Sequence, residues 1–234
     1  MIELVFAQLQ RRDRSGADCV ADNGICPDWI ADNFDRYVTP FWEHVYLTLV
    51  SVAIGFAIAF GLALLAHRWR WLASPITQVT GIFYTLPSVA VFFLLLPLTG
   101  RGNTTAIIAL VAYTLLILFR NFMAGFENVP AEARDAGRGM GLTERQLLWG
   151  VELPLALPEI MAGLRIAVTT TVGLASLAFL AGAGGLGEAL FDDINFRSNV
   201  LVAGGLAIGL AVVLDLLILG LQKAVTPWTR AAAA

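Results

Sequence analysis

The sequence predicts an all-α integral membrane protein with five transmembrane helices, and composition and segment length are the two observations that predict it. Of its 234 residues, 58% are hydrophobic and only 14% are charged, whereas about a quarter of the residues in a soluble domain carry a charge. Five segments are apolar over sixteen residues or more, and about twenty apolar residues in a helix span the hydrocarbon of a bilayer. The net charge of −3 leaves no basic surface for nucleic acid.

The first two predicted spans differ in their continuity. Residues 45–66 hold no charged side chain in 22 positions, which as a helix gives a length of about 33 Å. A basic and aromatic segment, 67–71, follows it and is typical of the membrane–water interface. The second span, at about 76–98, contains Pro87, which lacks a backbone N–H and is expected to interrupt the helix.

The remaining three spans are predicted at about 104–119, 160–183 and 200–221. The fourth span ends in the segment Gly182–Gly187, which has four glycines in six residues. Such a segment favours either a flexible gate or a turn with close helix packing, because small residues let backbones approach. The fifth span carries Asp215, and an ionisable residue within a span indicates a function unless water or a partner stabilises its charge.

The distribution of basic residues predicts which side of the membrane each loop faces. The spans make up a membrane domain over residues 44–228, which follows an acidic tail over residues 1–43. Nine arginines and lysines lie on one side of the predicted spans, against two in the short loops opposite. Because cytoplasmic loops are enriched in basic residues, we expect the N-terminus outside the cell and the C-terminus in the cytoplasm.

The acidic tail contains both cysteines of the chain. Cys19 and Cys26 flank Asn23-Gly24, a pair that favours a tight turn. The expected extracytoplasmic side is oxidising, which favours a disulfide. Two free thiols fit the sequence equally well, because the spacing does not give the distance between the two Cα atoms.

The interruption at Pro87 makes its neighbours candidates for a translocation path. A broken helix is tolerated in a membrane only where it faces protein or a water-filled cavity, and Tyr84 and Ser88 are expected one turn apart on the same face. The alternative is a kink that serves packing alone. A quaternary ammonium ion could bind aromatic rings here by cation–π attraction, and the aromatic residues nearby are Phe83, Tyr84, Phe92 and Phe93.

Asp215 is the second candidate for the path. It lies six residues before the end of its predicted span. Its charge is expected either to reach water or to pair with Arg120 or Arg165.

The segment 127–158, between the third and fourth spans, is the most structured of the predicted loops. Pro130 suits the first turn of a short helix, which Gly137, Gly139 and Gly141 are expected to end. A second short helix should then begin, and it should finish before Pro154.

The start of this second helix carries a recognisable signal. Thr143 and Gln146 have the residue types and spacing of a capping box, and Leu142 and Leu147 have those of a hydrophobic staple. The loop is therefore expected to present two short helices, joined by a glycine turn, to the cytoplasm.

One motif spans the whole loop: Asp135-Ala136-Gly137, three residues, Gly141, nine residues, Val151, one residue, and Leu153-Pro154. It resembles the EAA motif of ABC-importer permeases, in which Glu-Ala-Ala, glycine, isoleucine and Leu-Pro have the same spacings. There are two departures. Aspartate replaces the leading glutamate and shortens its reach, and glycine replaces the second alanine, which weakens a helix by ~1 kcal/mol.

The resemblance covers roughly residues 32–228. Outside the loop it rests on four segments that are similar to permeases for glycine betaine, choline and carnitine, the osmoprotectant group: Phe83–Ser88, Leu96–Gly100, Ala106–Leu110 and Ala181–Gly187.

This resemblance implies the type I ABC importer permease fold, also called MetI-like, in the cytoplasmic (inner) membrane of the cell. Two permease subunits, identical or paralogous, would surround the path, and an extracytoplasmic substrate-binding protein would deliver the solute. Two cytoplasmic ATPase subunits, which hold ATP and Mg²⁺, would dock on the EAA helices and move them. The residues implied in this coupling are Asp135, Ala136, Gly137, Gly141, Leu147, Val151, Leu153 and Pro154.

The chain itself is not expected to be an enzyme or to bind a cofactor or metal, since it has no GxxxxGK[ST] nucleotide-binding motif. An alternative function is a secondary transporter driven by protons through Asp215, although five spans without an internal repeat are unusual in that class. A membrane scaffold without transport is the third possibility.

Overall fold

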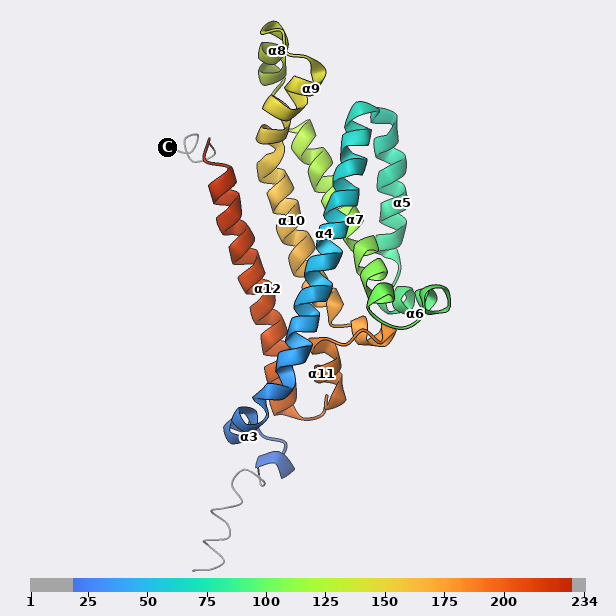
Figure 1. Ribbon diagram of the computed structural model, residues 1–234, viewed down its shortest axis with the longest axis vertical. Coiled ribbons are helices and arrows are strands. Elements are labelled where there is room, and N and C mark those ends of the chain that lie inside the picture. Colours follow the sequence, from blue (N-terminus) through green and yellow to red (C-terminus); the bar gives the residue numbers. More distant parts are fainter. Residues whose placement is uncertain (1–18, 229–234) are drawn as a thin grey trace, which may run out of the picture.

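The computed structural model describes residues 19–228, and within this range all the regular elements are helices (Figure 1). Four helical segments are long and apolar enough to cross a membrane. They contain α4 (Val38–Arg68), α7 (Asn103–Glu127), α10 (Leu153–Ala175) and α12 (Arg197–Val225). The described part of the chain is therefore a bundle of membrane-spanning helices, which is the predicted fold class.

The second predicted span is a broken one. Helix α5 (Ala73–Thr85) and helix α6 (Ser88–Thr99) are bent by 98° relative to each other. Leu86 between them is extended, with ψ of 139°, as expected for the residue before a proline. The predicted interruption at Pro87 is confirmed, but Tyr84 and Ser88 do not share a helix face, because the bend separates them.

The ends of α7 and α10 differ from the predicted limits of the third and fourth spans. Helix α7 continues to Glu127 instead of ending at 119, because Phe122 and Phe126 on its last turns are fully buried. The fourth span was expected to run to 183, but α10 ends at Ala175. The chain then turns through the 3₁₀ helix η4 (Ala178–Ala181) into α11 (Leu186–Asp192).

The prediction that the loop helix ends before Pro154 is wrong. Helix α9 (Glu144–Leu147) runs through a π-helical turn, η3 (Leu148–Glu152), into α10, so that one helical segment extends from Glu144 to Ala175. A proline clashes with the carbonyl four residues before it in an α-helix. The wider π turn relieves this clash, because its hydrogen bonds join residues five apart.

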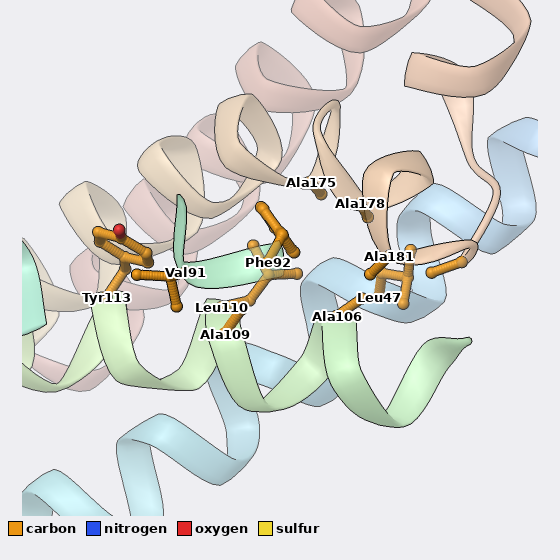
Figure 2. Packing of buried hydrophobic residues seen from close by; sticks show 11 residues of the cluster. Leu47, Val91, Phe92, Ala106, Ala109, Leu110, Tyr113, Ala175, Ala178 and Ala181 are labelled. Carbon is orange, nitrogen blue, oxygen red and sulfur yellow. The ribbon is translucent and has the colours of Figure 1, made fainter. Parts of the chain in front are cut away.

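The core lies where α7 packs against α4 and α10. Toward one end of the bundle, Leu47, Phe92 and Leu110 are fully buried among alanines of α7 and of the segment after α10 (Figure 2). Toward the other end, alanines of α4 face buried phenylalanines of α7. These small α4 side chains let the helices approach closely, as is common in membrane bundles.

The part of the predicted tail that the structure describes is folded. It contains α3 (Pro27–Asp32) and the 3₁₀ helix η1 (Phe34–Tyr37), and α4 begins at Val38, before the start of its predicted span. Residues 1–18 lie outside the described residues. We call the end of the bundle that carries α3 and α11 the α3 end, and the opposite end, which carries α8 (Ala131–Gly139) and α9, the α8 end (Figure 1).

Candidate functional site

The two short helices of the α8 end are set by local signals in the sequence. Pro130 directly precedes α8, which has Glu132 in its first turn and Arg138 in its last, and these charges match the helix dipole. Gly141, with φ of +81°, makes the turn after it. The prediction that Gly137 also breaks the helix is wrong, because Gly137 lies within α8, whereas Gly139 is the last residue of the helix.

Helix α9 begins with the predicted capping box. The Gln146 side chain accepts a hydrogen bond from the Thr143 backbone N–H (2.9 Å), and the Gln146 N–H donates to the Thr143 hydroxyl (3.4 Å). The capping box is thus confirmed. It gives α9, only one turn long, a fixed starting point.

A small apolar cluster joins α8 to α9. Leu147 is 1% exposed, and its Cδ1 atom lies only 2.6 Å from where a Cβ atom on Gly137 would be. Leu142 and Val151 side chains also face Gly137. The predicted partners Leu142 and Leu147 therefore both lie against Gly137, and glycine at this position lets the two helices touch.

The predicted coupling residues divide into a buried and an outer group. Gly137 and Leu147 are buried, whereas Asp135 is exposed. Sequence reasoning missed two large exposed apolar side chains in this loop, Met140 at 73% and Trp149 at 50%. The signal for them was a pair of large apolar residues within a charged loop. The remaining predicted residues are Ala136 and Gly141, both exposed, and Val151, Leu153 and Pro154, all half-buried.

A buried carboxylate, also missed, lies beneath these helices. Glu152 is 5% exposed, and its two oxygens accept hydrogen bonds from His67 of α4 (2.8 Å) and Arg134 of α8 (2.6 Å). A polar pocket of about 380 Å³ opens beside it, lined by these side chains and by Arg70, Arg138 and Glu144 among others.

The residues predicted for the path lie in two separate places. Tyr84 on α5 packs edge-on against Tyr113 of α7, with ring centroids 6.2 Å apart. The Tyr113 hydroxyl donates to the Leu86 carbonyl (2.7 Å), which satisfies a backbone group at the break before Pro87. Ser88 begins α6 beyond the break.

Asp215 is not part of this group. On α12, it pairs with Arg165 of α10 and not with Arg120. Of the aromatic residues near the break, Phe92 is fully buried, while Phe83 and Phe93 are about half exposed.

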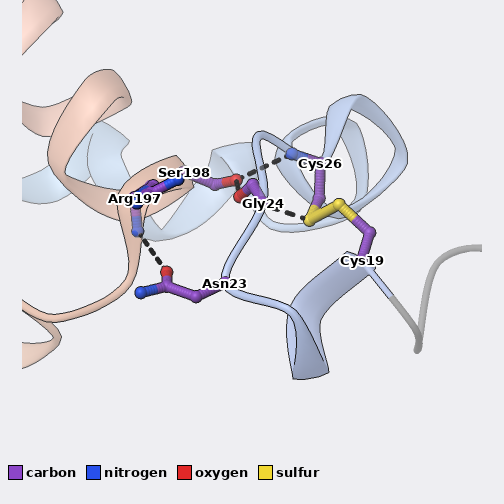
Figure 3. The surroundings of a disulfide bond; sticks show 6 residues. All are labelled: Cys19, Asn23, Gly24, Cys26, Arg197 and Ser198. Atoms are coloured by element: carbon purple, nitrogen blue, oxygen red, sulfur yellow. Dashed lines mark hydrogen bonds between the residues drawn. A yellow bond between two sulfur atoms is a disulfide. The ribbon is translucent and has the colours of Figure 1, made fainter.

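At the α3 end, a disulfide joins Cys19 and Cys26 (Figure 3). The loop that it closes is fixed to the start of α12. The Ser198 hydroxyl accepts from the Cys26 N–H (2.8 Å) and donates to the Gly24 carbonyl (3.0 Å), and Asn23 accepts from the Arg197 N–H (2.9 Å). Across residues 19–228, no group of three or more His, Cys, Asp or Glu side chains is arranged to hold a metal ion.

Comparison with known proteins relates this architecture to transport. A family model described as "Binding-protein-dependent transport system inner membrane component" matches residues 51–231. An osmoprotectant import permease protein, OsmW, of Salmonella typhimurium is 37% identical over 206 residues, covering 85% of this chain and 96% of that protein. A carnitine transport permease protein, OpuCB, of Listeria monocytogenes is 33% identical over 198 residues, covering 84% and 91%.

A third relative and two solved structures agree with these matches. The glycine betaine/carnitine/choline transport system permease protein OpuCB of Bacillus subtilis is 34% identical over 187 residues, covering 79% of this chain and 86% of that protein. An inward-facing MetNI methionine ABC transporter superposes with a TM-score of 0.66 at 24% identity, over 82% of this chain and 94% of the other. An amino acid ABC transporter gives 0.67 at 14% identity, over 82% and 96%.

Proposed function

The chain belongs to the family of binding-protein-dependent transport system inner membrane components, and from this premise we propose that it is the permease subunit of an ATP-driven importer for glycine betaine, choline, carnitine or a related quaternary ammonium osmoprotectant. The observation that carries the proposal is the 30–37% identity, over most of the chain, to permeases named for these solutes. The fold shared with ABC importer permeases supports it.

The proposed assembly gives this chain three kinds of partner. A second permease, identical or paralogous, completes the path, and an extracytoplasmic binding protein delivers the solute at the α3 end. Cytoplasmic ATPase subunits, which bind ATP and Mg²⁺, dock on the α8 end. This orientation rests on the excess of arginine and lysine in the loops of the α8 end.

The outer residues of α8 and α9 are the proposed docking surface. Met140 and Trp149 offer exposed apolar area, and Asp135 of α8 offers an exposed charge. The buried residues Gly137 and Leu147 shape this surface from within. ATP-driven closure of the ATPases would move α8 and α9 and open the path outward, and hydrolysis would reset it.

Transport can be tested by co-reconstituting the permease in liposomes with its partner ATPase and binding protein. We expect uptake of radiolabelled glycine betaine, choline or carnitine that requires ATP and is insensitive to a proton ionophore. Uptake that survives ATP depletion but collapses with the ionophore would contradict the proposal and favour a proton-driven mechanism.

Docking can be tested with one matched pair of variants. Met140→Asp places a charge on the proposed docking surface, whereas Ile25→Asp places one at the α3 end, where Ile25 is 60% exposed. We expect Met140→Asp to prevent co-purification of the ATPase and Ile25→Asp to retain it, because interface cores exclude unpaired charges. Full ATPase binding by Met140→Asp would place the docking surface elsewhere.

A further inference from the structure

Side chains from two other helices meet the carboxylate of Glu152. Its carboxylate lies in the π turn η3 and is almost wholly shielded from water. His67 reaches it from the last turn of α4, and Arg134 reaches it from the middle of α8. We call Glu152, His67 and Arg134 the α8-end joint.

Arg134 extends the joint to a further helix. Besides its bond to Glu152, its guanidinium donates to the carbonyls of Phe126 (2.5 Å) and Val129 (3.1 Å), at and just beyond the end of α7. Carbonyls at a helix C-terminus lack partners within the helix, and an arginine satisfies them well. The His67 ring also packs on Phe126, with centroids 4.8 Å apart.

The α8-end joint therefore connects α8 to the ends of α4 and α7 through side chains whose positions are fixed by hydrogen bonds. Buried, charge-assisted hydrogen bonds are short and directional, and a buried carboxylate is stable only while its partners remain. A movement of α8 that keeps the joint intact must carry the ends of α4 and α7 with it.

Resting on the proposed function, we propose that Glu152 is a positioning residue that transmits movement of the docked helices to α4 and α7. The apolar contact of Gly137 with Leu147 cannot serve this purpose, because it joins α8 only to α9. The loop is already joined covalently to α7 on one side and to α10 on the other, and the joint adds a link to α4.

The test compares ATP hydrolysis and solute uptake by the reconstituted importer. Glu152→Gln weakens both bonds of the joint, whereas His67→Ala removes only the link to α4 and leaves Arg134 and Glu152 paired. Asn128→Ala is the matched control, since Asn128 also joins the end of α7 to α10, through Glu159 (3.4 Å), without touching α8.

We expect both joint variants to hydrolyse ATP at close to the normal rate but to take up at least about fivefold less solute per ATP. His67→Gln keeps an N–H donor and should recover much of the loss. Asn128→Ala should behave as the unmodified protein does. A purely structural role would lower assembly, hydrolysis and uptake together and leave their ratio unchanged.

Normal uptake per ATP in His67→Ala would overturn the inference, because the joint would then only shape the docking helices. This holds even if Glu152→Gln fails to assemble. A lowered ratio in His67→Ala supports it whether or not Glu152→Gln assembles. Absence of ATP-dependent uptake in the unmodified importer would instead contradict the proposed function.

Discussion

Arg165 of α10 donates two hydrogen bonds, each 2.8 Å long, to the two carboxylate oxygens of Asp215 on α12. This two-point pairing satisfies both charges within the bundle, where a lone ionised side chain is costly. The pair ties α12 to α10, against which α12 packs most extensively. Asp215 therefore has a structural partner in this conformation.

We expect Asp215→Asn to lower the unfolding temperature of the detergent-solubilised protein, because it leaves the Arg165 charge without a carboxylate partner. The double variant Arg165→Leu/Asp215→Leu removes both charges and should recover most of the loss. Thermal unfolding followed by fluorescence measures both effects. If the double variant is stable but no longer supports ATP-driven uptake, the Arg165–Asp215 pair has a role in transport beyond holding α10 against α12.

Gly137 and Gly139 provide a matched test of the contact between α8 and α9. A Cβ atom on Gly137 would meet Leu147, which is buried and cannot move aside freely, whereas Gly139 has open space. We expect Gly137→Ala to destabilise this contact by about 1–3 kcal/mol and to weaken ATPase co-purification. Gly139→Ala should stabilise α8 by up to about 1 kcal/mol. Equal ATPase binding by both variants would contradict this account.

Gly187 shows that packing explains at least one glycine of the Gly182–Gly187 segment. A Cβ atom there would overlap the backbone carbonyl of Ser176, a rigid neighbour, while Gly173 in α10 faces open space. We therefore expect Gly187→Ala to lower the unfolding temperature clearly and Gly173→Ala to leave it nearly unchanged. An unchanged unfolding temperature in Gly187→Ala would indicate that this segment moves easily.

Cysteine labelling tests the orientation of the bundle. After reduction, Cys19 and Cys26 should react with a membrane-impermeant maleimide added to spheroplasts, because the α3 end is expected outside the cell. Met140→Cys, in a chain with both native cysteines changed to serine, should react only in inverted vesicles. The reverse pattern would place the α8 end outside and contradict the proposed docking of ATPases there.

The helices and local caps could be predicted because they depend on nearby residues. Apolar stretches located the spans, and the capping box from Thr143 to Gln146 and the break at Pro87 follow from the preferences of single side chains. These signals act within a few residues and need no knowledge of the tertiary fold.

The remaining features depend on contacts between distant segments. Gly137 remains helical because Leu147 packs against it, and the helix continues through Pro154 because the π turn removes a clash. The choice of Arg165 over Arg120 as partner of Asp215 depends on how α10 and α12 are rotated. Glu152 was missed because a glutamate in a charged loop is usually solvated, and only the fold shows that it is buried.

The helical segment from Glu144 to Ala175 is continuous, so it sets the direction in which the docking surface faces around the helix axis relative to the membrane bundle. Each residue advances an α-helix by about 100°. Adding or deleting one residue between Trp149 and Pro158 would therefore swing the outward face of the loop to a different side of the axis. We expect natural variation in this stretch to take the form of substitutions, with its length held constant.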